Sequence, residues 1–184
     1  MRRRLLMSIG EKNLYDRIEY LEFDGSLIFD TGIKGSSTTQ IGVQFENTKY
    51  VYAEAYLFGC GGKTPLNSQL GTNGLWRYGT GSTYFDTNAV GIIFTAEVRP
   101  GKTTINDQSK QFSFNGFTTT DYTIQVGGNK TSNVTAYPSF IGRIYYFRML
   151  NNYQQVLDWI PVRRKCDGLE CFYDTLRQKF IEPL

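Results

Sequence analysis

The sequence contains no histidine, the side chain that most often performs acid–base chemistry near neutral pH. Without it, no Ser-His or Cys-His nucleophilic arrangement can form. The three cysteines are an odd number without metal-binding spacing, so they predict neither a disulfide framework nor a zinc site. Cys166 and Cys171 flank an Asp-Gly dipeptide, and either a disulfide or two reduced thiols would suit that spacing.

Long hydrophobic runs are also absent. No apolar stretch approaches the roughly 20 residues of a membrane helix. The beginning MRRRLLMS holds three consecutive apolar residues, whereas a secretory signal needs about 7–15. We therefore expect no membrane insertion and no secretion by that route. The formal net charge of +3 is modest, so we expect no nucleic-acid partner.

Aromatic residues and glycine are abundant, with 13 Tyr, 13 Phe and 19 Gly. This composition favours strands joined by tight turns. We count about ten to fourteen short strand patterns, and no segment has a helical period beyond two turns. The 184 residues suit one domain with a sizeable core. The sequence therefore predicts an all-β sandwich or barrel.

The chain divides into an N-terminal arm over residues 1–17 and a folded body over residues 18–184. The arm combines basic and apolar side chains that could dock onto a partner: Arg2, Arg3, Arg4, Leu5 and Leu6. Asp24-Gly25 lies between strand patterns at 20–23 and 26–30 and predicts a hairpin, because this dipeptide suits a primed two-residue turn.

Further strands follow from alternating apolar residues. Residues 40–46 place Ile41, Val43 and Phe45 on one face, and residues 91–99 place Ile92, Phe94, Ala96 and Val98 inward. Residues 75–79 and 82–86 predict a second hairpin. In the closing stretch we expect Ile144, Tyr146, Trp159, Phe172 and Phe180 in the core. The Arg163-Arg164-Lys165 run is expected to form a solvated strand edge.

Two segments resemble a known family. The opening IEYLEFDGSLIFDTGI (18–33) is similar to the first hairpin of concanavalin A-like, LamG-type jelly-roll domains found in tailed-phage and prophage structural proteins. The closing FIGRIYYFRML and DWIPVRRKCDGLECFYDTLRQKFI resemble the end of the same domains. The resemblance implies a two-sheet antiparallel jelly-roll sandwich in which the N- and C-terminal parts pair side by side.

The resemblance also implies a function: a non-catalytic virion structural protein, such as a capsid decoration, head-fibre or tail-associated subunit. Its expected partners are other virion proteins, host-surface glycans and further copies of itself, and its expected location is the virion. The alternative is a carbohydrate-binding module of a bacterial surface protein. A divergent glycoside hydrolase is a third alternative, although Glu22-Phe23-Asp24 lacks the second glutamate that such enzymes carry on the same strand. We therefore predict no enzyme.

Residues 75–86, LWRYGTGSTYFD, are the best candidate for a sugar-binding platform, since sugars stack on exposed aromatic rings. The predicted site residues are Trp76, Arg77, Tyr78 and Tyr84. The alternative is that Trp76 and Phe85 are core and the tyrosines line a sheet face. No cofactor is predicted, but loop oxygens leave a calcium ion as an open alternative: Asp86, Asn88, Asn106, Asp107 and Asp121.

Overall fold

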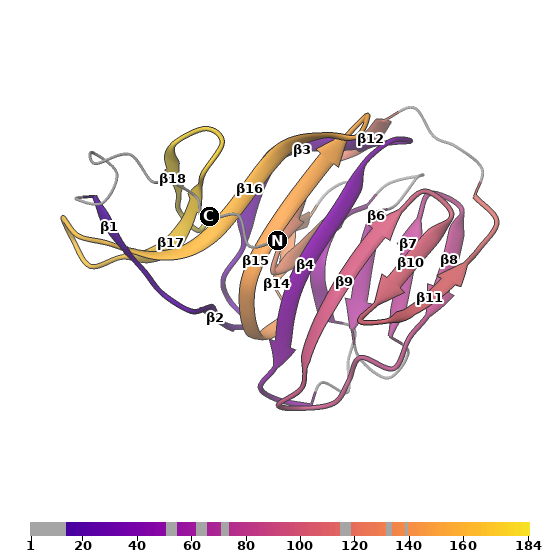
Figure 1. Ribbon diagram of the computed structural model, residues 1–184, viewed down its shortest axis with the longest axis horizontal. Helices are drawn as coiled ribbons and strands as arrows, with labels where there is room; N and C mark the ends of the chain where they lie inside the picture. Colours follow the sequence, from indigo (N-terminus) through magenta and orange to yellow (C-terminus); the bar gives the residue numbers. More distant parts are fainter. Residues whose placement is uncertain are drawn as a thin grey trace.

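The computed structural model describes residues 14–50, 55–61, 66–70, 74–114, 119–131, 134–138 and 140–184. Across these ranges every regular element is a β-strand, and the strands form two sheets (Figure 1). The predicted docking residues of the arm, Arg2, Arg3, Arg4, Leu5 and Leu6, lie outside the described residues.

The first sheet has ten strands. In spatial order they are β11 (Gln108–Gln111), β10 (Lys102–Ile105), β9 (Ile93–Arg99), β4 (Gln40–Asn47), β15 (Ile141–Asn151), β16 (Gln154–Arg164), β17 (Glu170–Asp174) and β18 (Lys179–Ile181), with β2 (Leu21–Asp24) beside β15 and β1 (Tyr15–Arg17) beside β16. All of these pairs are antiparallel.

The second sheet has eight strands. In order they are β14 (Val134–Pro138), β13 (Gly128–Thr131), β5 (Ala55–Cys60), β6 (Leu66–Leu70), β7 (Leu75–Tyr78) and β8 (Gly81–Tyr84), with β12 (Thr119–Val126) between β5 and β3 (Phe29–Ser36). Its pairs are antiparallel except the short β5–β13 contact. The β7–β8 pair is the hairpin expected from residues 75–86.

The two sheets share one hydrophobic core. Phe45 of the first sheet lies 6.3 Å from Trp76 of the second, and Phe58 of the second lies 6.0 Å from Phe147 of the first, measured between ring centroids. All four side chains are fully buried. This all-β arrangement of packed sheets is compatible with a β-sandwich. The alternation predicted for β4 is confirmed, because Ile41, Val43 and Phe45 are all buried.

The predicted hairpin at Asp24-Gly25 is wrong. Strand β2 pairs with β15 in the first sheet, whereas β3 pairs with β12 in the second. Gly25 has a positive φ of 96°, and Asp24 Oδ1 accepts a hydrogen bond of 2.8 Å from the Ser26 amide. The turn is therefore present, but it carries the chain between the sheets. Phe23 and Phe29 then meet in the core, 5.7 Å apart.

The expected pairing of the two ends of the chain is confirmed. Leu21 of β2 lies opposite Ile144 of β15, and Tyr15 of β1 lies opposite Arg164 of β16. Residues 15–17, which we expected in the arm, thus form a strand of the first sheet.

A β-bulge in β15 changes which side chains face the core. Ile144 lies opposite Phe45 and Tyr146 lies opposite Gln44, so Tyr145 is an extra residue between them. Beyond the bulge Phe147 is buried and Tyr146 is only partly buried, so the prediction of Tyr146 as a core residue is wrong. Ile92 was also expected inward, but it precedes β9 and is 48% exposed.

The C-terminal strands extend past the sandwich as a small lobe, at the left of Figure 1. It has its own buried cluster of Tyr15, Val162, Cys171 and Tyr173, against which Phe180 packs. Phe180 is thus a residue of this lobe and is only partly buried.

The basic run of this lobe is not a solvated edge, because β16 has β1 on one side and β17 on the other. Each cation is paired with acidic residues: Arg163 with Glu170, Arg164 with Asp167 and Glu182, and Lys165 with Asp16. The three cations of the run thus face four carboxylates.

Candidate functional site

The predicted aromatic platform divides between the two faces of the β7–β8 hairpin. Trp76 and Tyr78 are fully buried. Trp76 packs against core phenylalanines, and the Tyr78 hydroxyl donates hydrogen bonds to the carbonyls of Ser36 (2.8 Å) and Thr39 (2.7 Å). These two rings are therefore not accessible to a ligand from solvent. Because side chains alternate along a strand, both rings face the core. For Trp76 this agrees with the alternative stated above, in which Trp76 is a core residue.

Arg77 and Tyr84 point to solvent on the opposite face. The register places Tyr84 opposite Leu75 and Arg77 opposite Ser82, so the two side chains lie diagonally across one sheet face, within reach of long side chains. Tyr84 is 57% exposed. Of the four predicted residues, the structure brings these two together at the surface.

A groove of about 680 Å³ lies beside Tyr84. Its lining comprises Tyr50, Gly74, Tyr84, Phe85, Asp86, Asn88, Ala89, Val90 and Lys110. The rings of Tyr50 and Tyr84 are both exposed, and a carboxylate, an amide and an ammonium group lie in the same groove. We call this site the Tyr84 groove.

Local geometry holds the loop that forms the groove wall. The Phe85 amide donates to the Gly74 carbonyl (3.0 Å), and Gly74 has a positive φ of 48°. A Cβ at Gly74 would lie 1.7 Å from the Phe85 carbonyl oxygen, so only glycine fits there. The buried Asn47 side chain donates to the Thr87 carbonyl, and the Gly91 amide donates to the Asn47 carbonyl (3.0 Å). The loop is thus fixed at several points before any ligand arrives.

Lys110 closes the groove from the other sheet. It lies on β11 of the first sheet, and its Nζ donates to the carbonyl of Tyr84 on β8 of the second. The same Nζ lies 4.6 Å from the centroid of the Phe85 ring, in cation–π contact. Nothing in the sequence near Lys110 indicates this position, since it depends on how the two sheets stack.

Sequence reasoning treated Asp86 and Asn88 only as loop oxygens for calcium. The Asn88 amide lies 3.4 Å from Asp86 Oδ1, as in a turn. Among the described residues no group of three or more His, Cys, Asp or Glu side chains could hold a metal ion. Among the described residues that line the groove, Asp86 is the one that carries a carboxylate.

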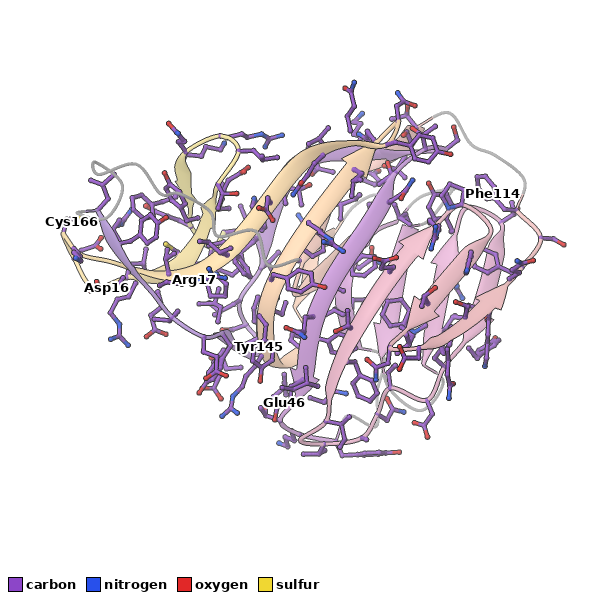
Figure 2. All side chains as sticks on the ribbon, viewed as in Figure 1. Asp16, Arg17, Glu46, Phe114, Tyr145 and Cys166 are labelled. Atoms are coloured by element: carbon purple, nitrogen blue, oxygen red, sulfur yellow. The ribbon has the colours of Figure 1, made fainter. Side chains whose placement is uncertain are left out.

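Glu22, the glutamate considered for a glycosidase, lies outside the groove, on the exposed face of the first sheet. Glu22 and Glu46 stand on either side of Arg143, with N–O distances of 3.9 Å and 3.5 Å. Figure 2 shows Tyr145 beside Glu46, and its hydroxyl donates to Glu46 Oε2 at 2.7 Å. Burial and this hydrogen bond raise the pKa of Tyr145 to about 12. These glutamates are thus engaged in an ion-paired cluster with an arginine between them.

Comparison with known proteins identifies no matching family model and no curated protein with significant sequence similarity. Among the described residues no helix is long and apolar enough to cross a membrane.

Proposed function

We propose that the protein is a non-catalytic virion structural subunit of the capsid-decoration, head-fibre or tail-associated kind, and that it binds host-surface glycans in the Tyr84 groove. The proposal of glycan binding rests on one observation: the exposed ring of Tyr84 lies in the same groove as Asp86, Asn88 and Lys110. An aromatic face that stacks on a sugar ring, next to planar polar groups that fix its hydroxyls, is the usual chemistry of sugar recognition.

The groove suits a neutral sugar. Among the described residues of its lining there are one carboxylate, from Asp86, and one ammonium group, from Lys110, so these two formal charges cancel. Asp86 can accept hydrogen bonds from sugar hydroxyls, and Asn88 can donate and accept. Because the loop is already held by Gly74 and Asn47, little ordering would accompany binding.

The virion assignment is supported by the resemblance of residues 18–33 and 140–181 to concanavalin A-like jelly-roll domains. The observed pairing of β1 with β16 and of β2 with β15 agrees with what that family implies for the two chain ends. We propose the jelly-roll topology on the same basis. A carbohydrate-binding module of a bacterial surface protein would use the same groove, and the genes adjacent to the coding sequence distinguish the two.

The glycan part is tested with a panel of neutral hexasaccharides (cello-, laminari-, malto- and xylohexaose) in calorimetric titrations. At least one should bind, and Tyr84→Ala should weaken that binding about fivefold, since an aromatic contact contributes on the order of 1 kcal/mol. Leu176→Ala removes an exposed apolar side chain of the C-terminal lobe, outside the groove, and should leave the affinity unchanged. Absence of binding across the panel, or equal effects of both variants, would overturn the proposal.

The docking part is tested by deleting residues 2–13. The deletion retains Leu14, whose carbonyl accepts a hydrogen bond of 3.0 Å from the Lys165 amide, and leaves β1 complete. The shortened chain should keep its melting temperature but lose incorporation into particles. Unchanged incorporation would refute a docking role for the arm.

A further inference from the structure

A second surface with binding chemistry lies at the opposite end of β4 and β9 from the Tyr84 groove. Tyr153 is 84% exposed at the tip of the β15–β16 hairpin. It has a positive φ of 63° and follows Asn152, whose φ is 49°. Two left-handed residues form a turn that strongly prefers glycine at its second position. A bulky side chain there is strained, and such strain is characteristic of functional positions.

The Tyr153 ring borders a furrow in the protein surface. A hollow of about 290 Å³ is lined by Ser37, Thr38, Gln40, Arg99, Pro100 and Tyr153. A neighbouring hollow of about 250 Å³ shares Gln40 and Arg99 with it and continues over Gly42 to Arg148 and Gln155. Because the two hollows share these residues, we treat them as one site and call it the Tyr153 furrow.

Among the described residues that line the furrow, the charged side chains are two arginines and one glutamate. Glu97 lies between Arg99 (3.6 Å) and Arg148 (3.2 Å), so one carboxylate is shared by two guanidinium groups. The Nε of Arg99 is buried and has no hydrogen-bond partner. Asp158 lies opposite Arg148 in the register, and its Oδ2 accepts a hydrogen bond from Thr175. The furrow lining thus carries an excess of positive charge.

We propose that the Tyr153 furrow binds a saccharide that bears a carboxylate, that is, a uronic acid residue. The Tyr153 ring provides the face on which the sugar ring stacks. Arg99 provides planar donors that match a carboxylate, and Gln40 and Thr38 provide hydrogen bonds for the hydroxyls. The Tyr153 furrow shares no lining residue with the Tyr84 groove.

The test compares trigalacturonate with its methyl ester in calorimetric titrations of the full chain at low salt. The ester keeps the sugar rings and removes the charges. Trigalacturonate should bind at least tenfold more tightly than the ester, and the difference should shrink as salt rises. Arg99→Gln should weaken trigalacturonate binding about tenfold or more, as expected for loss of a hydrogen bond between charged groups.

Tyr153→Gly distinguishes a loss of ligand binding from a loss of protein stability. Glycine relieves the left-handed strain, so the melting temperature should stay equal or rise while trigalacturonate binding weakens about tenfold or more. Arg163→Gln removes an exposed arginine of the C-terminal lobe and should leave binding unchanged. Three outcomes would overturn the inference: no binding of trigalacturonate, equal binding of the ester, or binding that is insensitive to both furrow variants.

Discussion

Arg148 on β15 reaches over Gly42 on β4 to Glu97 on β9, with Nη2 3.2 Å from Oε1. Gly42 lies opposite both residues in the register. A Cβ at this position would lie 2.5 Å from Nε of Arg148 and 3.0 Å from its Cγ. The missing side chain of Gly42 therefore leaves the space in which an ion pair connects strands that are not neighbours.

Gly42→Ala should displace the Arg148 side chain and break its contact with Glu97. Both partners are substantially exposed, so a double-mutant cycle with Glu97→Gln should give a coupling free energy of about 0.2–1 kcal/mol. Urea unfolding of the wild type, both single variants and the double variant measures it. If the two substitutions change the free energy of unfolding additively, the ion pair between Arg148 and Glu97 does not depend on the absence of a side chain at Gly42.

The cysteines should differ sharply in reactivity. Cys166 is an exposed free thiol, whereas Cys60 and Cys171 are buried, and burial raises the pKa of Cys171 to about 11. Because the thiolate is the reactive form, a disulfide reagent should titrate one thiol in the native protein and three in denaturant. Cys166→Ser should abolish the native reaction. A native protein without any reactive thiol would indicate a Cys166–Cys171 disulfide.

The C-terminal lobe should lose stability in acid. The hydrogen bond from Arg164 holds the pKa of Asp167 at about 2, below its usual value of 3.8. A lowered pKa stabilises the folded state above about pH 4, and this contribution disappears as the pH falls towards 2. Hydrogen-exchange protection factors, which correct for the intrinsic pH dependence of exchange, should therefore fall in β1 and β17 over this range before they fall in β4.

Arg164→Gln tests the cause of this acid sensitivity. The variant should show low protection factors in β1 and β17 already at pH 6, with little further change down to pH 3. Arg163→Gln, which removes the neighbouring cation, should retain the wild-type profile. An Arg164→Gln profile that matches the wild type would show that another group controls the lobe.

Tyr145 should contribute to alkaline unfolding. Burial and the hydrogen bond with Glu46 raise its pKa from 10.0 to about 12. The folded state then holds a proton that the unfolded state releases, so the stabilisation is complete below pH 10 and is lost as the pH rises to 12. In urea unfolding at pH 9, 10 and 11, Tyr145→Phe should show a shallower decline than the wild type. Parallel declines would contradict the assignment.

Local patterns predicted much of the strand content. The Thr80-Gly81 region was expected to join two strands, and β7 and β8 do pair, with Tyr78 opposite Gly81. The same reasoning failed at Asp24-Gly25, where the turn is present but its strands enter different sheets. A turn-forming dipeptide predicts the local backbone angles. It does not predict strand pairing, because that depends on which strand, often remote in the sequence, has a free edge for hydrogen bonding.

The candidate site was predicted only in part. Arg77 and Tyr84 do face solvent, but alternation turns Trp76 and Tyr78 into the core. Within a short hairpin the sequence pattern does not say which face is covered when both faces carry aromatic residues. Lys110 is separated from Tyr84 by 26 residues in the chain and joins it only because β11 and β8 belong to stacked sheets.

The sequence by itself determined the all-β class, the burial of alternate residues in β4 and the adjacency that its family resemblance implied for the two chain ends. These follow from side-chain period, turn-forming residues and recognisable segments, all of which are local. Only the tertiary structure decided the sheet to which β3 belongs, the bulge at Tyr145, the Tyr84 groove and the Tyr153 furrow. Each of these depends on contacts between segments that are remote in the chain. Strands compete for pairing edges and side chains compete for buried positions, and the outcome of that competition decides which strands pair and which side chains face the core.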